Sequence, residues 1–402
     1  MELGQVQSQL DYLIYTKQKH SYSKAVGKLI DLSASYISDA EQAYAAGRKN
    51  AVWCGNLGWE VPLLFACDTI PVAFSEMGRL SDRQAMEIAE DYYQFPAETC
   101  SMVKCTVGEW HKRRGSGIKR IIGNSSNCEP YNQAWEIMKQ EGYDVHNVEV
   151  FYRARGIDGQ RLETLIQFFR KQIDDVLEWL TGSTEIDEDK LRLEIKRKNR
   201  LLAKVRKILE LRLQNPFYIR SLPTIILLNI GLNNYFGKPE EFEAMVDDLI
   251  SELETAVVDE ADLARVIPLV WGYGTGQEFG VFEAIDQAGG ALLGLRGVPF
   301  RDYREDVPPL EALVRYIYDN QGAGAGIYAR NVIEQEIKKV NARGLILYGY
   351  IGCSFSSIDK EMWREYFHQQ GIPSISLEGS FQVGAPTGQV LTRVKAFIEM
   401  LS

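Results

Sequence analysis

The stretch Leu345-Ile346-Leu347-Tyr348-Gly349-Tyr350-Ile351 is followed by Gly352 and then by Cys353. Its unbroken run of apolar residues and glycine predicts a buried strand. A shorter run, Ile121-Ile122-Gly123, precedes Cys128 and predicts a second buried strand. Each cysteine therefore lies where a strand has ended and a helix can begin. In open α/β sheets ligands bind at this carboxyl edge, so both positions are candidates for a functional site.

A third cysteine, Cys100, opens a helix-like stretch from Ser101 to Trp110, after the helix-breaking pair Phe95-Pro96. If the three loops converge, Cys100, Cys128 and Cys353 offer three thiolates and one vacant position. Three thiolates can hold a cubane iron-sulfur cluster with one iron left without a protein ligand, whereas fully protein-ligated clusters commonly use four cysteines. No two of these cysteines form a CxxC pair, so buried structural thiols are the competing interpretation.

The other three cysteines are ambiguous when each is taken alone. Cys67 ends the apolar run Leu63-Leu64-Phe65-Ala66, which favours a role in core packing. Cys105 lies five residues beyond Cys100, about 500° of rotation along one helix, so the two side chains diverge by about 140°. They could more easily serve two metal centres than one. Cys54 follows a short strand at a sheet edge and is either a neighbour of the site or a core residue.

Composition limits the classes of protein that the chain can belong to. A chain of 402 residues is too long for one ordinary core, which favours two α/β units with a helical segment. Apolar residues make up 45% and charged residues 25%, as in soluble globular proteins. The net charge of −10 argues against nucleic-acid partners and against binding to an anionic membrane.

No long uncharged apolar stretch and no export signal are visible, so we expect a cytoplasmic protein with no membrane-spanning helix. In that reducing compartment six cysteines are better candidates for metal ligation or burial than for disulfides. No P-loop motif is present, and the four histidines lack metal-ligand spacing, which argues against a zinc hydrolase. The Gly272 to Gly280 segment lacks a full GxGxxG register, so a tight turn is favoured over a phosphate cradle.

Periodicity divides the chain into four segments. Residues 1–48 predict a helical arm, and the strand-helix alternation over 49–155 predicts a first α/β domain. Residues 156–258 predict a helical insert whose many charges form a solvated helix face. Residues 259–402 predict a second α/β domain. Such units give parallel sheets, with Cys128 in one and Cys353 in the other, so the expected site lies in the cleft between them.

A set of short motifs is spread over most of the chain. The motifs are Glu60-Val61-Pro62, Ile70-Pro71-Val72, Cys100-Ser101-Met102-Val103-Lys104, the strand leading to Cys128, Asn199-Arg200, Cys353, Ile372-Pro373, Leu377-Glu378 and Gln389-Val390-Leu391-Thr392-Arg393-Val394-Lys395-Ala396-Phe397-Ile398-Glu399. In this order they resemble the 2-hydroxyacyl-CoA dehydratase and benzoyl-CoA reductase family. The last run, TRxxAFxE after a glutamine, is the most specific.

The resemblance implies that Cys100, Cys128 and Cys353 bind a [4Fe-4S] cluster between two truncated Rossmann-like domains. In this family a separate ATP-hydrolysing iron-sulfur activator delivers single electrons of very low potential. In the dehydratases, which are pairs of paralogous subunits, the electron enters the thioester carbonyl of a 2-hydroxyacyl-CoA. The resulting ketyl radical expels the hydroxyl group, and the electron is then recovered. The open iron could bind a substrate oxygen as a Lewis acid.

Two departures from the family pattern bear on the site. Gly58-Trp59 precede Glu60, where the family usually has a proline, and Gly379-Ser380 replace an acidic residue that often follows the Leu-Glu pair. The first affects acyl-CoA contacts near Cys54, and the second affects the lining near the C-terminal strand. Glu60 either transfers a proton or caps and orients a helix.

Within this family the chain most resembles the double-cubane cluster proteins, homodimeric reductases of small molecules that use the same kind of activator. They have an early cysteine six residues before the glutamate, as Cys54 stands before Glu60. Their two cubanes share a bridging sulfide, and three cysteines hold each cubane. Cys54, Cys67 and Cys105 would then form the second set.

The expected function is therefore that of a double-cubane iron-sulfur reductase of small molecules, an oxidoreductase. One alternative is a single-cubane subunit of a 2-hydroxyacyl-CoA dehydratase, a lyase, or of a benzoyl-CoA-reductase-like enzyme, with an acyl-CoA as substrate. An alternative of another class is a non-catalytic electron-transfer or structural protein whose cluster is closed by a fourth ligand. A zinc-stabilised fold is a further alternative.

Overall fold

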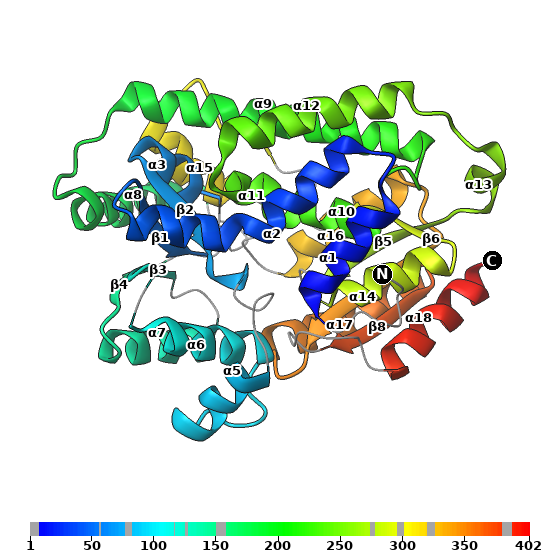
Figure 1. Ribbon diagram of the computed structural model, residues 1–402, viewed down its shortest axis with the longest axis horizontal. Coiled ribbons are helices and arrows are strands. Elements are labelled where there is room, and N and C mark those ends of the chain that lie inside the picture. The colour runs from blue at the N-terminus through cyan, green and yellow to red at the C-terminus, as the bar shows by residue number, and fades with distance from the viewer. Residues whose placement is uncertain are drawn as a thin grey trace.

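Eight short strands form two separate parallel sheets in the part of the chain that the computed structural model describes, residues 8–55, 58–76, 83–115, 117–124, 128–149, 158–273, 278–295, 301–319, 326–379 and 388–402. The fold is α/β, with N-terminal helices and a helical insert between the sheets (Figure 1), which confirms the predicted fold class.

The two sheets repeat one topology. The first has the order β2 (Thr69–Ala73), β1 (Asn50–Cys54), β3 (Arg120–Asn124) and β4 (Asp144–Val148). The second has the order β6 (Gly290–Leu295), β5 (Ile267–Tyr273), β7 (Gly344–Tyr350) and β8 (Ser374–Gly379). Strands β1 and β5 are therefore counterparts, as are β3 and β7. In doubly wound sheets of this order, ligands bind at the carboxyl ends of the first and third strands, where the strand order reverses.

Helices cover both faces of the first sheet. Successive side chains of β1 point to opposite sides of the sheet, and those on both sides are buried. Ala51 and Trp53 belong to one core and Val52 and Cys54 to the other. The first face is covered by α2 (Lys24–Ala45), α6 (Ser101–Arg113) and α7 (Glu129–Gln140). The second face is covered by α3 (Glu60–Ala66), α8 (Gly159–Thr181), α9 (Glu188–Gln214) and α15 (Pro309–Asp319).

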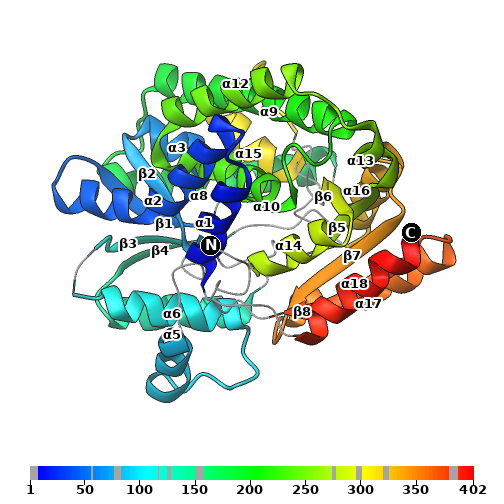
Figure 2. The ribbon, with the colours of Figure 1, turned by 45° about the vertical axis from the view of Figure 1, so that its right-hand side comes forward.

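The second sheet is also covered on both faces. One face packs against α14 (Phe279–Gln287) and α18 (Gly388–Leu401), and the other against α16 (Gly326–Lys339) and α17 (Ser354–Gln369). Figure 2 shows α17 and α18 beside β8 at the C-terminal end of the chain. The first face continues the core of the first sheet, so a single hydrophobic core joins the two sheets.

The arm and the insert are helical, as predicted. The arm consists of α1 (Gln9–Lys19) and α2, and Lys19 of α1 forms an ion pair with Glu283 of α14. The insert and its flanks contain α8, α9, α10 (Ser221–Ile225), the π-helix η4 (Ile226–Gly231), α11 (Leu232–Asn234), η5 (Tyr235–Gly237), α12 (Pro239–Thr255) and α13 (Glu260–Arg265). The remaining short helices are η2 (Phe74–Glu76), α5 (Arg83–Glu87) and the π-helix η3 (Ile88–Tyr92).

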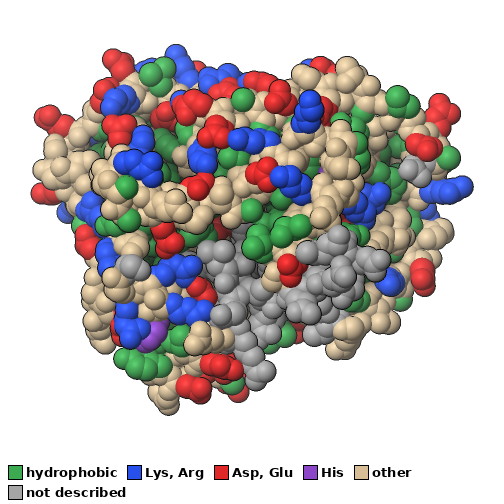
Figure 3. All heavy atoms as spheres, viewed as in Figure 1, with side chains coloured by type: hydrophobic (Ala, Val, Ile, Leu, Met, Phe, Trp, Pro, Cys, Tyr) green, Lys and Arg blue, Asp and Glu red, His purple; other side chains and the backbone are tan. Residues whose placement is uncertain are grey.

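The charged face of α9 is partly paired with α12. Arg200 donates to Glu243 at 2.6 and 2.8 Å, and Lys204 donates to Asp247 at 2.8 Å. Figure 3 shows these charges of both signs intermixed along the α9 and α12 edge of the molecule. Exposed pairs of this kind contribute about 0–1 kcal/mol each, so the layer depends mainly on its apolar side. No described helix is both long enough and apolar enough to span a membrane.

Helix α15 crosses between the two halves of the chain. It lies within the predicted second domain, 259–402, yet Leu313 and Tyr316 are buried in the core on the second face of the first sheet. There α15 packs against α8 and α9. The second half of the chain therefore contributes a helix to the core of the first sheet. The four domain boundaries stay a prediction.

The buried carboxyl of Glu336 on α16 gives a prediction about the pH dependence of stability. It faces Gly294 of β6, is 5% exposed, and burial raises its pKa to about 7. Between about pH 4.5 and 7 the folded chain retains a proton that the unfolded chain has lost, so stability falls as pH rises through this range. We expect Glu336→Gln to remove roughly 2–3 kcal/mol of this loss, measured by urea unfolding at pH 4.5 and 8.

The matched control is Glu334→Gln on the same helix. Lys338 holds the pKa of Glu334 below its usual value, so this carboxylate favours folding at high pH. Glu334→Gln should leave the fall in stability between pH 4.5 and 8 in place. An unchanged pH profile in Glu336→Gln would contradict the assignment.

Candidate functional site

The three widely spaced cysteines each occupy the N-cap position of a helix. Cys100 precedes α6, Cys128 precedes α7, and Cys353 precedes α17. Cys128 follows β3 and Cys353 follows β7, so these two cysteines hold equivalent places in the two repeated sheets. A helix N-terminus presents unpaired N–H groups and partial positive charge, which favours an anionic sulfur ligand.

The structure brings the loops that carry Cys100 and Cys353 into direct contact. The side chains of the two cysteines are hydrogen-bonded to each other, and Cys353 also acts on Cys128 through its charge. Gly352 has a φ of +80°, and a Cβ at this position would lie 2.2 Å from the carbonyl oxygen of Glu98. Only glycine allows this approach, so the carboxyl edge of the second sheet meets the loop that enters α6 here.

The surroundings of Cys100 and Cys128 favour the protonated form of their thiols. The hydrogen bond with Cys353, together with burial, raises the pKa of the Cys100 thiol, although backbone N–H groups of Met102 and Val103 oppose the change. Burial also raises the pKa of Cys128, against a hydrogen bond from the backbone of Tyr131. The buried thiol of Cys100 and the half-buried thiol of Cys353 cannot readily both ionise side by side, whereas a bound cation would favour the thiolates and release their protons.

A tyrosine lies beside the cysteines. Tyr131 is 5% exposed, its hydroxyl lies 3.2 Å from Thr106 Oγ1, and its ring stacks on Trp135 with centroids 5.0 Å apart. Burial raises the pKa of Tyr131 well above its ordinary value, and the charges of Cys128, Cys100 and Tyr350 add to the effect. Because Tyr131 belongs to the first half and Tyr350 to the second, both halves of the chain contribute to the site.

The other three cysteines are not gathered with one another. Cys54 and Cys105 are fully buried in different cores, on opposite faces of the first sheet. Cys67 follows α3 at the amino end of β2, whereas Cys54 ends β1, about 13 Å away along the strands. Burial and the charge of Asp68 raise the pKa of Cys67 to about 11. The predicted second ligand set therefore has no geometric support and stays a prediction.

Glu60 and Glu278 hold equivalent places in the two halves. Glu60 is the first residue of α3, after β1, and is 0% exposed. Glu278 is the N-cap residue of α14, after β5, and is 6% exposed. Tyr348 donates a 2.6 Å hydrogen bond to Glu278 Oε2. Sequence reasoning found Glu60 but missed Glu278, which only the repeated strand order identifies as a counterpart.

The replacement of an acidic residue by Gly379 has a visible cause. A Cβ at residue 379 would lie 1.7 Å from the Tyr348 hydroxyl and 2.3 Å from Glu278 Oε2. The Glu278 carboxylate therefore occupies the space that a side chain from β8 would fill. Residues 274–277, in the middle of the glycine-rich segment, lie outside the described residues.

A second network, also missed from the sequence, positions the start of α3. The Asn199 side chain accepts a 2.8 Å hydrogen bond from the Tyr303 amide and donates a 2.9 Å bond to the Tyr303 carbonyl. The Tyr303 hydroxyl donates to the carbonyl of Gly58, and its ring stacks on Tyr316 at 3.9 Å. Gly58 has a φ of +104°, and a Cβ there would lie 2.3 Å from the Tyr316 ring. The glycine before Glu60 is therefore required by this stacked pair.

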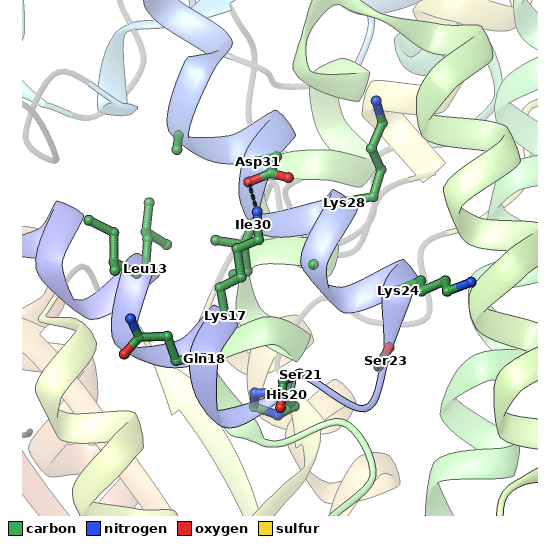
Figure 4. A pocket seen from close by; sticks show the side chains of 13 residues that line it. Leu13, Lys17, Gln18, His20, Ser21, Ser23, Lys24, Lys28, Ile30 and Asp31 are labelled. Atoms are coloured by element: carbon green, nitrogen blue, oxygen red, sulfur yellow. Dashed lines mark hydrogen bonds and ion pairs between the residues drawn. The ribbon is translucent and has the colours of Figure 1, made fainter. Parts of the chain in front are cut away.

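The described residues offer no ready site for a single metal ion, since no three His, Cys, Asp or Glu side chains are grouped closely enough. A groove of ≈ 770 Å³ lies between α1 and α2, and Figure 4 shows Lys17, His20, Lys24 and Lys28 among its lining residues. No cysteine lines this groove. The three N-cap cysteines are therefore the best candidate site, and their all-sulfur donor set fits an iron-sulfur cluster, whose ligands bind different irons.

The Asn199 network yields a prediction. Asn199→Ala removes both bonds to the Tyr303 backbone and a 2.7 Å bond to Glu305, which should cost roughly 1–3 kcal/mol. We expect faster amide exchange over residues 301–308, measured by hydrogen-exchange mass spectrometry. The matched control is Asn215→Ala, at the end of the same helix, which removes only an exposed 3.2 Å bond to Val257. Equal exchange rates over 301–308 in both variants would contradict the assignment.

Comparison with known proteins identifies the family of the chain. A family model described as 2-hydroxyglutaryl-CoA dehydratase, D-component, matches residues 60–401, from α3 to α18, which include every strand except β1. No curated protein has a sequence that matches the chain significantly. The family match spans most of the chain and includes all of the candidate cysteines except Cys54. The chain therefore belongs to the 2-hydroxyglutaryl-CoA dehydratase D-component family.

Proposed function

We propose that this chain is the iron-sulfur subunit of a 2-hydroxyacyl-CoA dehydratase-type enzyme, in which Cys100, Cys128 and Cys353 hold one [4Fe-4S] cluster. The observation that carries the proposal is the arrangement of these three cysteines on three helix N-termini, with the carboxyl edge of the second sheet in contact with the loop that enters α6. The family match supports an iron-sulfur subunit that works with a separate ATP-dependent activator.

The surroundings of the three thiols suit a buried anionic cluster. The backbone N–H groups of Met102, Val103 and Tyr131 lower the pKa of the Cys100 and Cys128 thiols and so favour the thiolate form. Hydrogen bonds to cluster sulfurs and low solvent exposure are among the features that set a cluster's potential. Cys100 is 4% exposed, so these bonds act in a poorly hydrated environment.

Three cysteine ligands leave one iron of a cubane for another ligand. Cys54 lies in a different core and Cys67 lies at the opposite edge of the first sheet, so neither is placed to serve as a fourth ligand, whereas Cys105 shares the core of Cys100 and lies further along the same helix, α6. When bound, such a cluster would supply single electrons and a Lewis-acidic iron for a substrate oxygen. An open iron position distinguishes the proposed enzyme from the alternative electron-transfer protein, in which a fourth ligand would close the cluster.

The chain's own groups would manage protons beside the cluster. We assign Glu278 as the acidic group of this site, held by Tyr348 in the place that the family's missing carboxylate would take. Tyr348 remains protonated, because burial and Glu278 raise its pKa well above its ordinary value. Glu60 lies at the equivalent position of the first sheet, and Tyr303 fixes the backbone just before it.

The double-cubane reductase is the competing proposal. It needs six thiolates in two neighbouring sets, whereas Cys54 and Cys105 belong to different cores and Cys67 lies at the opposite edge of the first sheet from Cys54. The single-cubane form is therefore favoured.

Iron analysis of the anaerobically purified protein tests the proposal. We expect about four irons and four acid-labile sulfides per chain. Cys100→Ser, Cys128→Ser and Cys353→Ser should each lose most of the iron, whereas Cys54→Ser, Cys67→Ser and Cys105→Ser should retain it. About eight irons, with loss in all six variants, would support the double cubane. Zinc in place of iron would refute both forms.

Glu278 gives a separate prediction for catalysis. Glu278→Gln should retain the iron content but slow turnover of a 2-hydroxyacyl-CoA by about 10²–10⁴-fold, since an amide cannot transfer a proton. The assay uses the protein with its activator and a panel of 2-hydroxyacyl-CoA thioesters. Glu283→Gln is the matched control on the same helix, because it breaks only the contacts of Glu283 with α1 and Gln287. Equal rates in both variants would remove Glu278 from the mechanism.

A further inference from the structure

The contact between Cys100 and Cys353 joins two distant parts of the chain. Cys100 lies on the loop before α6 in the first half, and Cys353 lies between β7 and α17 in the second. Their side chains are in hydrogen-bond contact. None of the six cysteines, all of which are described, is in a disulfide bond.

The backbones on either side of this contact are also close. A Cβ at Gly352 would lie 2.9 Å from the Cys100 nitrogen and 2.8 Å from the Thr99 carbonyl carbon. The two chain segments therefore touch directly beside the two thiols. A disulfide needs Cα atoms about 4.4–6.8 Å apart, and segments in backbone contact meet this need with little movement.

We propose that Cys100 and Cys353 form a disulfide when no metal is bound, and that this bond links the two α/β halves of the chain. The bond forms between the two sulfur atoms as the thiols lose two protons and two electrons to an oxidant. With diamide, the nitrogen-nitrogen double bond accepts both and becomes a hydrazine. A dithiol reductant reverses the reaction by thiol-disulfide exchange.

The remaining cysteines are less suited to pairing. The pKa of Cys128 is affected by the charge of Cys353, whereas Cys100 and Cys353 are hydrogen-bonded to each other. Cys54 and Cys105 are fully buried on opposite faces of the first sheet. We therefore expect a single disulfide, which removes two of the three proposed cluster ligands and so prevents reloading with iron until it is reduced.

The test uses the full chain, stripped of metal by a chelator under reducing conditions and then treated with diamide after the reductant is removed. Thiols are counted in denaturant, and the peptides are mapped by mass spectrometry without reduction. We expect the six thiols to fall to four, with one linked pair of peptides containing Cys100 and Cys353. Cys128→Ser should form the same link, whereas Cys100→Ser and Cys353→Ser should not.

A backbone variant tests the geometry without removing a thiol. Gly352→Ala places a Cβ against Glu98 and Cys100 and should separate the two loops, which lowers the yield of the link several-fold. Gly371→Ala is the matched control, because its φ is +74° and nothing lies within 4 Å of the added Cβ. It carries the same backbone strain without the clash and should form the link as the parent chain does.

The outcomes are separate from those of the proposed function. Retention of six thiols after diamide, or a link that involves Cys128 in place of Cys100 or Cys353, would overturn the inference. A chain that forms the link but never binds iron would support this inference and refute the cluster. A chain that binds iron through the three cysteines but forms no link would support the proposed cluster and refute this inference.

Discussion

The close approach of Gly352 to the backbone before Cys100 is the contact on which the site depends. It is possible because residue 352 has no side chain and adopts a positive φ. Through it the carboxyl edge of the second sheet meets the loop that enters α6. Three helices then direct their N-termini toward one region, and each of them begins with a cysteine. A larger residue at 352 would separate the two halves of the site while leaving both sheets intact.

Two effects act in opposite directions on the pKa values of the thiols at the site. Burial keeps the thiols protonated when no metal is present, and the N–H groups at the helix N-termini favour the thiolate form. Because burial outweighs the helix N-termini, the thiols release their protons only when a cation binds. Metal binding and deprotonation are therefore linked. Metal binding is also linked to the packing of the two halves of the chain, since each half contributes candidate ligands. The contact between the two loops also holds the Cys100 and Cys353 thiols close enough for the proposed disulfide to form when no metal is bound.

Much of this organisation could be predicted from the sequence. Strand-helix alternation gave the fold class, because buried parallel strands are continuous apolar runs and crossover helices are amphipathic. The bounds of α14 and α18 agree with the periodicity of residues 279–287 and 388–401. The placement of Cys128 and Cys353 at strand ends was also readable, since a carboxyl edge follows directly from strand order.

Long-range pairing could not be predicted. Helix α15 packs on the first sheet although its neighbours in sequence belong to the second, and no local pattern encodes that choice. Alternation along β1 places Cys54 on one face, but only the fold shows that Cys105 lies on the other. Glu278 and Tyr303 act through partners 70 or more residues away, Tyr348 and Gly58. Single-sequence reasoning cannot supply such partners, because hydrogen bonds between distant residues leave no periodic signal.

The most direct test of the central claim is an anomalous-scattering map, recorded at the iron absorption edge from crystals grown without oxygen. The account predicts one compact iron feature at the N-termini of α6, α7 and α17, within bonding distance of the sulfur atoms of Cys100, Cys128 and Cys353. A feature located elsewhere, or one bound by Cys54, Cys67 or Cys105, would contradict it.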